Sequence, residues 1–228
     1  MSPATRPTGR RVRPERSGPN PNHALSEQGF ERARRVLMRR DKVLGAVIKR
    51  HGRCGLGDHR THQPFASLVG TIVSQQLSGK AADTIFKRVV ALVGDHAGLT
   101  PVAVLAIEPE ALRAAGLSRQ KVTYVRDLAE RVSTGTLDLH ALDRHPDDAV
   151  IAAITAVKGL GRWSAEMFLM FRLNRPDVFP VGDLGIVKGV QKLYGMKRRP
   201  TPQTMERLAE PWRPYRSVAA WYLWRSLE

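Results

Sequence analysis

The sequence predicts an all-α protein. Apolar residues recur at steps of three and four, helix start and stop signals follow one another at short intervals, and no run alternates with the two-residue period of a strand. A chain of 228 residues with 42% hydrophobic residues is long enough for one large domain or two small ones around a core. We therefore expect about ten helices from this pattern.

The helical periodicity is clearest in two segments of the second half. Each has four apolar residues on one side of a helix: Val122, Val125, Leu128 and Val132 in the first, and Val150, Ile151, Ile154 and Val157 in the second. Ser78 is a candidate N-cap for the segment that follows it, Gly116 a candidate helix stop, and Thr201 with Pro202 a candidate start. Loops are predicted at 52–57 and 174–180, which are rich in Gly, Pro and Asn.

The first 24 residues differ from the rest of the chain. Residues 1–24 are rich in Pro, Arg, Gly and Ser and nearly lack bulky apolar side chains. Such a segment buries too little surface to offset the entropy of ordering, so a disordered basic tail is predicted there. Residues 25–228 are the predicted helical core.

The charge balance favours a polyanionic partner. Lys and Arg number 37 against 21 for Asp and Glu, which gives a formal net charge of +16. Nucleic acid is the commonest partner of such a chain, although solubility alone would also explain the excess.

The same composition excludes several classes of site. The single cysteine, Cys54, excludes an internal disulfide and any four-cysteine zinc or iron–sulfur site. No segment approaches the roughly 20 apolar residues that a membrane span needs, and the N-terminus lacks the apolar part of a secretory signal. We expect a cytoplasmic protein without a membrane partner, associated with the nucleoid if it is bacterial.

A short glycine-flanked turn stands out at 157–171, "VKGLGRWSAEMFLMF". It joins an amphipathic helix to an apolar one through Gly159, Leu160 and Gly161. Two glycines leave the backbone bare, and the N-terminus of the second helix favours an anion. With Lys158 and Arg162 beside it, the pattern indicates a helix-hairpin-helix that binds DNA phosphate. A plain corner between two helices is the alternative.

Asp183 is the candidate for chemistry. It follows the turn-forming segment "VFPVG" and precedes an apolar helix start, 22 residues after Gly161 (183 − 161). An aspartate in this position is ordinarily an N-cap.

The hairpin followed by this aspartate is a pattern that the sequence shares with a known family. The chain resembles the helix-hairpin-helix DNA glycosylase superfamily, and within it the 3-methyladenine DNA glycosylase II branch. The resemblance covers about Pro64 to Leu227 and includes the segments "FASLVGTIVSQQLSGKAADTIFKRV", "VKGLGRWSAEMF", "VFPVGDLGI" and "WRPYRSVAAWYLW".

The resemblance implies two helical subdomains with an active-site cleft between them. The central subdomain would span about 70–180 and contain the hairpin at 157–164, while 25–69 and 181–228 would form the second. The α/β domain that precedes the helices in the well-known bacterial member is absent, so this chain resembles a compact form.

The resemblance also implies the reaction. Bifunctional members carry a lysine where this chain has Trp163, and an indole cannot form a Schiff base with a sugar. We therefore expect a monofunctional hydrolase without AP-lyase activity, which releases 3-methyladenine, 7-methylguanine and related alkylated purines from duplex DNA by base flipping. Asp183 would be the catalytic residue, and no cofactor or iron–sulfur cluster is expected to take part in catalysis.

The remaining site residues follow from matching positions in the family. Trp163 and Trp224 would line the base pocket, together with Met167 and Arg225, which depart from family tyrosines, while Trp221 and Tyr222 are assigned to the core. The expected DNA contacts are Lys158, Gly159, Gly161, Arg162 and Ser164 in the hairpin, and Gln76 or Leu77 as a wedge. The carbonyls of Thr155, Val157 and Leu160 would bind a Na⁺ or K⁺ ion.

Two other hypotheses remain. A noncatalytic helix-hairpin-helix protein would need the hairpin and the charge but no carboxylate at the pocket. The second is a glycosylase for another lesion class. For the alkylpurine glycosylase, the full lesion range stays open. The expected partner is double-stranded DNA with alkylated bases, bound by a monomer.

Overall fold

The computed structural model describes residues 24–61, 63–94 and 98–228. These residues contain α-helices, short 3₁₀ segments and one π-helical segment but no strand, so the all-α prediction is confirmed. None of the described helices combines the length and the apolar character needed to cross a membrane. The predicted tail, 1–24, lies outside the described residues except for Ala24.

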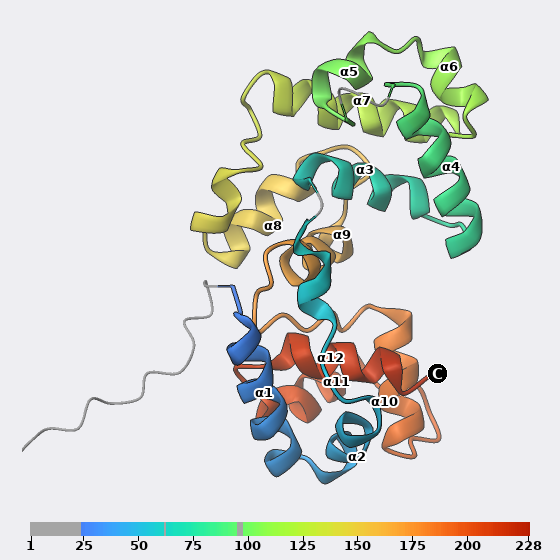
Figure 1. Cartoon of the computed structure of the whole chain (residues 1–228). Helices are drawn as coiled ribbons and strands as arrows, with labels where there is room; N and C mark the ends of the chain where they lie inside the picture. The colour runs from blue at the N-terminus through green and yellow to red at the C-terminus, as the bar shows by residue number, and fades with distance from the viewer. Residues whose placement is uncertain (1–23, 62, 95–97) are drawn as a thin grey trace, which may run out of the picture.

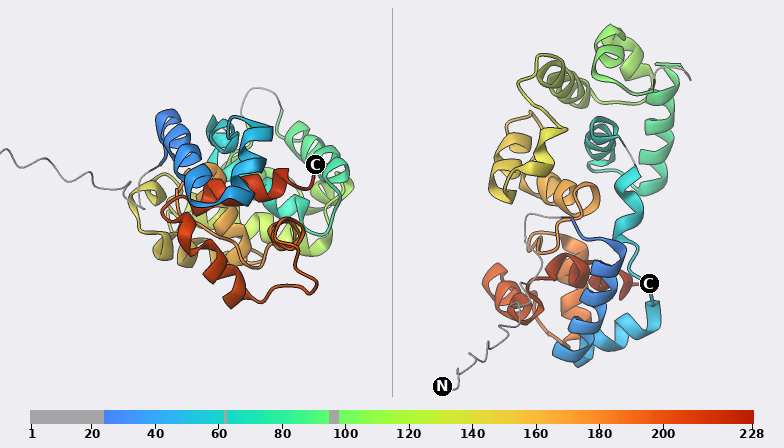
Figure 2. Two further views of the ribbon diagram at one scale, coloured as in Figure 1. Left: turned by 90° about the horizontal axis from the view of Figure 1, so that it is seen from below. Right: turned by 60° about the vertical axis from the view of Figure 1, so that its left-hand side comes forward.

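The helices form two groups, one above the other in Figure 1. The lower group contains α1 (Glu27–Arg40), α2 (Lys42–His51), α10 (Leu184–Leu193), α11 (Pro202–Ala209) and α12 (Arg216–Arg225). The upper group contains α3 (Pro64–Ser74), α4 (Gly79–Ala91), α5 (Pro101–Ala106), α6 (Pro109–Ala114), α7 (Arg119–Ser133) and α8 (Asp147–Thr155). The turned view on the right of Figure 2 shows the same two groups.

One helical stretch lies at the junction of the two groups. Helix α9 (Arg162–Met167) packs against α8 and continues as the π-helical segment η3 (Phe168–Arg172). That segment contacts α3 of the upper group and the 3₁₀ helix η1 (Leu56–Thr61). The chain thus runs through the junction at α9 and η3 before it enters the lower group.

The predicted subdomain limits agree only in part with these elements. The limit after residue 69 falls inside α3, and because α3 packs against α4 and α7, the whole helix lies with the upper group. The limit after residue 180 falls in the loop that precedes α10.

Six of the eight apolar positions expected from periodicity are buried, including Val157, while Val132 and Ile151 are partly buried and pack against the core. Val122, Val125 and Leu128 on α7 are buried, as are Val150 and Ile154 on α8. Residues at three- and four-residue steps share a helix face, and these faces pack against neighbouring helices.

The predicted start and stop signals act at the helix ends in most cases. The hydroxyl of Thr201 accepts a hydrogen bond from Thr204 N–H at 3.2 Å, and Gly116 has a φ of +115°. Ser78 occupies the N-cap position of α4, but its side chain makes no capping hydrogen bond.

Asp41 connects the start of α2 to the segments that follow α10 and α11. Its Oδ1 caps α2 by accepting a hydrogen bond from Leu44 N–H at 2.9 Å. Its Oδ2 accepts hydrogen bonds from the Tyr194 hydroxyl at 2.6 Å and from Trp212 Nε1 at 2.9 Å. Burial, together with the Asp41 carboxylate, raises the pKa of Tyr194, so the phenol remains a donor.

We expect Asp41→Ala to lower the free energy of unfolding by about 2–4 kcal/mol. The change removes a helix cap and leaves the polar groups of Tyr194 and the fully buried Trp212 without an acceptor. Urea denaturation followed by far-UV circular dichroism would measure the loss. Asp83→Ala, on the exposed surface of α4, is the control and should stay within about 0.5 kcal/mol of wild type. A loss below about 1 kcal/mol for Asp41→Ala would contradict this role.

Candidate active site

The hairpin between α8 and α9 has the geometry that its glycines predict. Gly159 has a φ of +79°, and a Cβ placed there would lie 2.0 Å from Cδ2 of Tyr124. Leu160 is buried, while Gly161 is the N-cap residue of α9 and an added Cβ would meet nothing within 4 Å among the described residues. The turn therefore packs one glycine against a tyrosine of α7 and leaves the other open at the surface.

Asp127 on α7 holds the first residue of this turn. Its Oδ2 accepts a hydrogen bond from the backbone N–H of Lys158 at 2.9 Å, and another from Arg131 Nε at 2.9 Å. The Lys158 ammonium lies 3.7 Å from Oδ1. Burial opposes ionisation of Asp127, but these hydrogen bonds and charges outweigh it and lower the pKa of the carboxyl.

Four of the five predicted hairpin residues lie at the surface. Lys158, Gly159, Gly161 and Arg162 are exposed, so two cations and two glycines surround the N-terminus of α9. Ser164 differs from the prediction because only 3% of its surface is exposed. It lies one turn into α9 on the side that packs inward, so its hydroxyl is not presented with the other four.

Asp183 occupies the junction between the two groups of helices. It is the N-cap of α10, and its Oδ1 accepts hydrogen bonds from Ile186 N–H and from Trp224 Nε1, each at 2.8 Å. Its Oδ2 accepts a hydrogen bond from Trp163 Nε1, also at 2.8 Å. The capping interpretation is thus correct in geometry, and the same carboxylate also receives indole donors from α9 and α12.

These three bonds leave Asp183 with spare acceptor capacity. A carboxylate offers about four acceptor positions, and Oδ2 has one of its two filled. The residue is half-buried rather than fully buried. Oδ2 therefore retains a lone pair, on a group whose orientation is held by three neighbours.

Gly185 allows Trp224 to reach this carboxylate. A Cβ at Gly185 would lie 2.7 Å from Cδ1 of Trp224, closer than side chains approach one another. Any larger residue would push the indole away from Oδ1 of Asp183. Gly185, the second glycine of "GDLGI", thus has a packing role that its sequence context did not reveal.

A cavity of about 500 Å³ opens beside Trp224, between α3, the end of α9 with η3, and α12. Phe171 stacks on Trp224 with ring centroids 5.6 Å apart and an interplanar angle of 20°. The cavity is lined by Ser67, Gly70, Thr71, Ser74, Met167, Phe168, Phe171, Trp221, Trp224 and Arg225. A hollow of this size with aromatic walls suits a small planar ligand.

The structure divides the four predicted pocket residues. Met167, Trp224 and Arg225 line this cavity. Trp163 does not; it is 42% exposed and lines a second hollow of about 490 Å³, which includes Gln76, Tyr124 and Gly159. Ser74 lines both hollows. Asp183 accepts one hydrogen bond from Trp224, which lines the first hollow, and one from Trp163, which lines the second.

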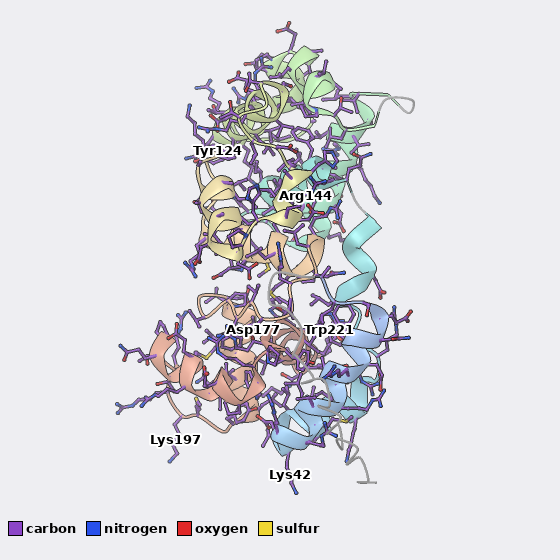
Figure 3. The ribbon with its side chains drawn as sticks, turned by 90° about the vertical axis from the view of Figure 1, so that its left-hand side faces the viewer. Lys42, Tyr124, Arg144, Asp177, Lys197 and Trp221 are labelled. Carbon is purple, nitrogen blue, oxygen red and sulfur yellow. The ribbon has the colours of Figure 1, made fainter. Side chains whose placement is uncertain are left out.

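The sequence predicts core positions for Trp221 and Tyr222, and only Tyr222 is fully buried. Tyr222 is fully buried, whereas Trp221 is half-buried and lines the aromatic cavity. The guanidinium of Arg225 lies 5.3 Å from the centroid of the Trp221 ring. Figure 3 shows Trp221 near the junction and Tyr124 in the upper group of helices.

Sequence reasoning missed two further residues near the site. Phe171 was one of several apolar residues in "MFLMF", and only the π-helical turn that contains it brings its ring onto Trp224. Glu166 is 8% exposed and accepts a hydrogen bond from Arg162 Nε at 3.0 Å. Burial raises the pKa of Glu166, and the charge of Asp183 adds to the rise although Arg162 opposes it.

The predicted wedge lies in the turn between α3 and α4. Gln76 has a φ of +59°, and Leu77 is an exposed apolar side chain. The neighbouring Gln75 donates a hydrogen bond from Nε2 to the carbonyl of Gly159 at 2.7 Å. The wedge turn and the hairpin are therefore in direct contact.

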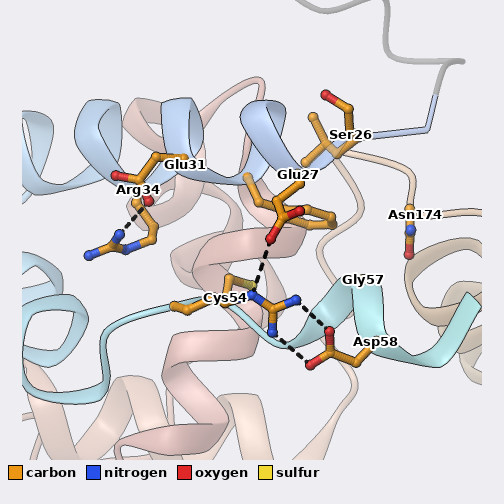
Figure 4. A pocket seen from close by; sticks show the side chains of 11 residues that line it. Ser26, Glu27, Glu31, Arg34, Cys54, Gly57, Asp58 and Asn174 are labelled. Atoms are coloured by element: carbon orange, nitrogen blue, oxygen red, sulfur yellow. Dashed lines mark hydrogen bonds and ion pairs between the residues drawn. The ribbon is translucent and has the colours of Figure 1, made fainter.

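A separate cavity of about 510 Å³ lies between α1 and the segment around Cys54, and shares no lining residue with the aromatic cavity (Figure 4). Arg53 bridges Asp58 at 2.7 Å and Glu27 at 3.6 Å within it. Burial raises the pKa of the Cys54 thiol to about 12, so the single cysteine remains neutral.

Comparison with known proteins identifies the family of the chain. Residues 69–214 match the family described as "HhH-GPD superfamily base excision DNA repair protein". A curated relative, DNA-3-methyladenine glycosylase 1 of Schizosaccharomyces pombe, is 34% identical over 165 residues, which is 72% of this chain and 72% of the relative.

Two solved structures have the same fold. A DNA-3-methyladenine glycosidase from Bacillus halodurans is 40% identical, with a TM-score of 0.73 over 83% of this chain and 86% of that one. The 3-methyladenine DNA glycosylase of Schizosaccharomyces pombe in complex with abasic DNA is 32% identical, with a TM-score of 0.77 over 85% and 95% of the two chains. The family match spans more than half of the chain and includes helices of both groups. The protein therefore belongs to the HhH-GPD superfamily of base excision DNA repair proteins.

Proposed function

We propose that this protein is a monofunctional DNA glycosylase that hydrolyses the N-glycosidic bond of alkylated purines in duplex DNA. The observation that carries the proposal is the Asp183 carboxylate, which three donors hold at the junction and one of whose donors, Trp224, lines the aromatic cavity. Similar proteins are named 3-methyladenine DNA glycosylases, and one was solved with abasic DNA, which is what remains after a base is released. A protein that only binds DNA would need the hairpin and the charge but no carboxylate at a base pocket.

The hairpin supplies the hold on the DNA backbone. The exposed amides near Gly159 and Gly161 lie at the N-terminus of α9, with Lys158 and Arg162 beside them. Backbone amides and cations bind phosphate without distinguishing bases, which suits an enzyme that must search long stretches of DNA. Glu166 holds Arg162 in the absence of DNA, so binding of a phosphate would compete with this ion pair.

The cavity beside Trp224 is the proposed pocket for the flipped base. An enzyme that acts on a base in duplex DNA must rotate it out of the stack, at least cost when its pairing is weak. A purine alkylated at N3 or N7 carries positive charge, and stacking of a cation on the rings of Phe171 and Trp224 is worth about 0.5–2 kcal/mol. Arg225 also lines the cavity, and its guanidinium lies 2.8 Å from the Glu228 carboxylate, which offsets its positive charge beside a cationic base.

Asp183 would act at the sugar. A cationic purine leaves without a general acid, so the remaining needs are to stabilise the oxocarbenium-like sugar and to orient water. The spare lone pair of Oδ2 can accept a proton from that water or face the developing positive charge. Trp163 donates to this oxygen and offers no amine, so no Schiff base forms at this position and the DNA strand stays intact.

A monovalent cation at the hairpin remains part of the proposal. Val157 O accepts one hydrogen bond, from Leu160 N–H at 3.1 Å, and a carbonyl oxygen has a second lone pair. With the carbonyls of Thr155 and Leu160 it would present oxygens, which are the donors that hard cations prefer. Such an ion would add positive charge next to the phosphate.

We expect Asp183→Asn to lower the rate of base release by about 100-fold or more, because the sugar cation loses its counter-charge. Both oxygens of Asp183 accept an indole N–H, so an asparagine must turn its NH₂ toward one of the two tryptophans. Release of 3-methyladenine and 7-methylguanine from methylated duplex DNA would measure the rate.

The double variant Asp183→Asn/Trp163→Phe controls for that misfit, because it removes the donor opposite Oδ2. It should stay as slow as the single variant, while both bind duplex DNA as wild type does. Recovery of activity in the double variant would assign the loss to geometry rather than to charge. DNA binding without release by wild-type protein would instead favour the noncatalytic hypothesis.

The two hairpin glycines should respond differently to alanine. Gly159→Ala should lower the free energy of unfolding by about 2 kcal/mol or more, because the residue has a positive φ and its Cβ would overlap Tyr124. Gly161→Ala should leave stability within about 0.5 kcal/mol, since its Cβ meets open space.

Both changes should weaken duplex binding, measured by fluorescence anisotropy at one fixed salt concentration. At Gly161 the loss would come only from the methyl group standing between the backbone amides and a phosphate. Wild-type affinity for Gly161→Ala would mean that DNA does not approach the hairpin at this residue.

A further inference from the structure

One face of α7 contacts both elements that would touch DNA. Lys121, Tyr124 and Asp127 follow one another at three-residue steps along this helix. Tyr124 packs against Gly159 and Asp127 holds Lys158 N–H, so these two support the hairpin. Lys121 supports a different element, the turn between α3 and α4.

The contacts of Lys121 are short and directed at the backbone. Its ammonium donates hydrogen bonds to the carbonyls of Val73 and Gln75, each at 2.7 Å. These carbonyls belong to the last turn of α3 and its C-cap, where helix carbonyls lack intrahelical partners and a cation is favoured. Gln75 in turn donates its side-chain amide to the carbonyl of Gly159. The turn is therefore fastened on one side to α7 and on the other to the hairpin.

The turn needs such external support. Gln76 adopts a positive φ of +59°, which costs a non-glycine residue of the order of 1–3 kcal/mol. Leu77, which follows it, is exposed and apolar. A segment with strained backbone and an exposed apolar side chain keeps its position only if neighbouring groups hold it. Lys121 is placed to hold this turn. It is half-buried, and burial lowers the pKa of its ammonium group.

We propose that Lys121 is a positioning residue for base flipping, which holds the wedge turn at a set distance from the phosphate-binding hairpin through Val73 and Gln75. This inference rests on the proposed function. Lys121 touches neither the lesion nor the sugar in this role; it acts through Gln76 and Leu77. The consequence is that Lys121 affects the opening of a base pair and leaves the chemistry at Asp183 unchanged.

The wedge matters only when a base must be forced out of a stacked pair. Flipping costs a few kcal/mol for a paired base and less for an unpaired one. A loosened wedge should therefore slow release of a paired lesion and have little effect on the same lesion without a partner. A general loss of folding or of DNA affinity would lower both rates alike.

The test compares Lys121→Met with wild type on two duplexes that contain one 7-methylguanine. In the first duplex the lesion is paired with cytosine, and in the second it faces a spacer without a base. Methionine matches the length of lysine but cannot donate to the two carbonyls. Lys49→Met, an exposed change on α2 in the lower group, removes the same charge and is the matched control. Thermal unfolding of both variants verifies that they fold.

We expect Lys121→Met to release the paired lesion about tenfold more slowly and the unpaired lesion within about threefold of wild type, with Lys49→Met unchanged on both. If Lys121 acts through the wedge, Lys121→Met/Leu77→Ala should be no slower on the paired duplex than the slower single variant. Equal losses on the two duplexes, or additive losses in the double variant, would overturn the proposal and leave the glycosylase function intact.

Failure of the proposed function itself would look different. Wild-type protein would then release no base from either duplex. Flipping can still be followed through the fluorescence of 2-aminopurine, which rises when this base leaves the stack. A rise with wild type that Lys121→Met abolishes would support the positioning role, and an equal rise with both would overturn it.

Discussion

The three hydrogen bonds to Asp183 are the constraint on which the rest of the site depends. The donors come from α9, α10 and α12, so the carboxylate keeps its orientation only while the hairpin helix and two helices of the lower group stay in place. Gly185 lets Trp224 approach, and Trp224 in turn forms one wall of the cavity through its stack with Phe171. The same indole thereby holds the proposed catalytic carboxylate and lines the proposed base pocket.

The same hydrogen-bonding arrangement around an aspartate occurs at two places in the protein, with different roles. Asp41 and Asp183 both cap a helix with one oxygen and accept hydrogen bonds from two aromatic side chains. At Asp41 the partners include the fully buried Trp212, so the arrangement contributes to stability. Both carboxylates are half-buried, but at Asp183 one partner, Trp163, is exposed. The exposure of the donor side chains, rather than their pattern, separates the structural role from the proposed catalytic one.

The proposed DNA contacts form a connected unit on the upper group of helices. Helix α7 holds the hairpin through Tyr124 and Asp127 and the wedge turn through Lys121, while Gln75 joins the wedge turn to the hairpin directly. The cavity lies across the junction, so a flipped base would be received between elements of both groups.

The sequence alone determined the features that depend on neighbours three or four residues apart. These include the helical class, the buried faces of α7 and α8, the Gly159–Gly161 turn and the capping position of Asp183, because helix periodicity and turn chemistry are local. Only the tertiary structure decided that Trp163 and Trp224, 20 and 41 residues from Asp183, donate to the same carboxylate. It also moved Trp221 into the cavity wall, buried Ser164, and brought Lys121 to the wedge turn 46 residues away. Contacts over such separations follow from how helices pack, and no local spacing encodes which side chains then meet.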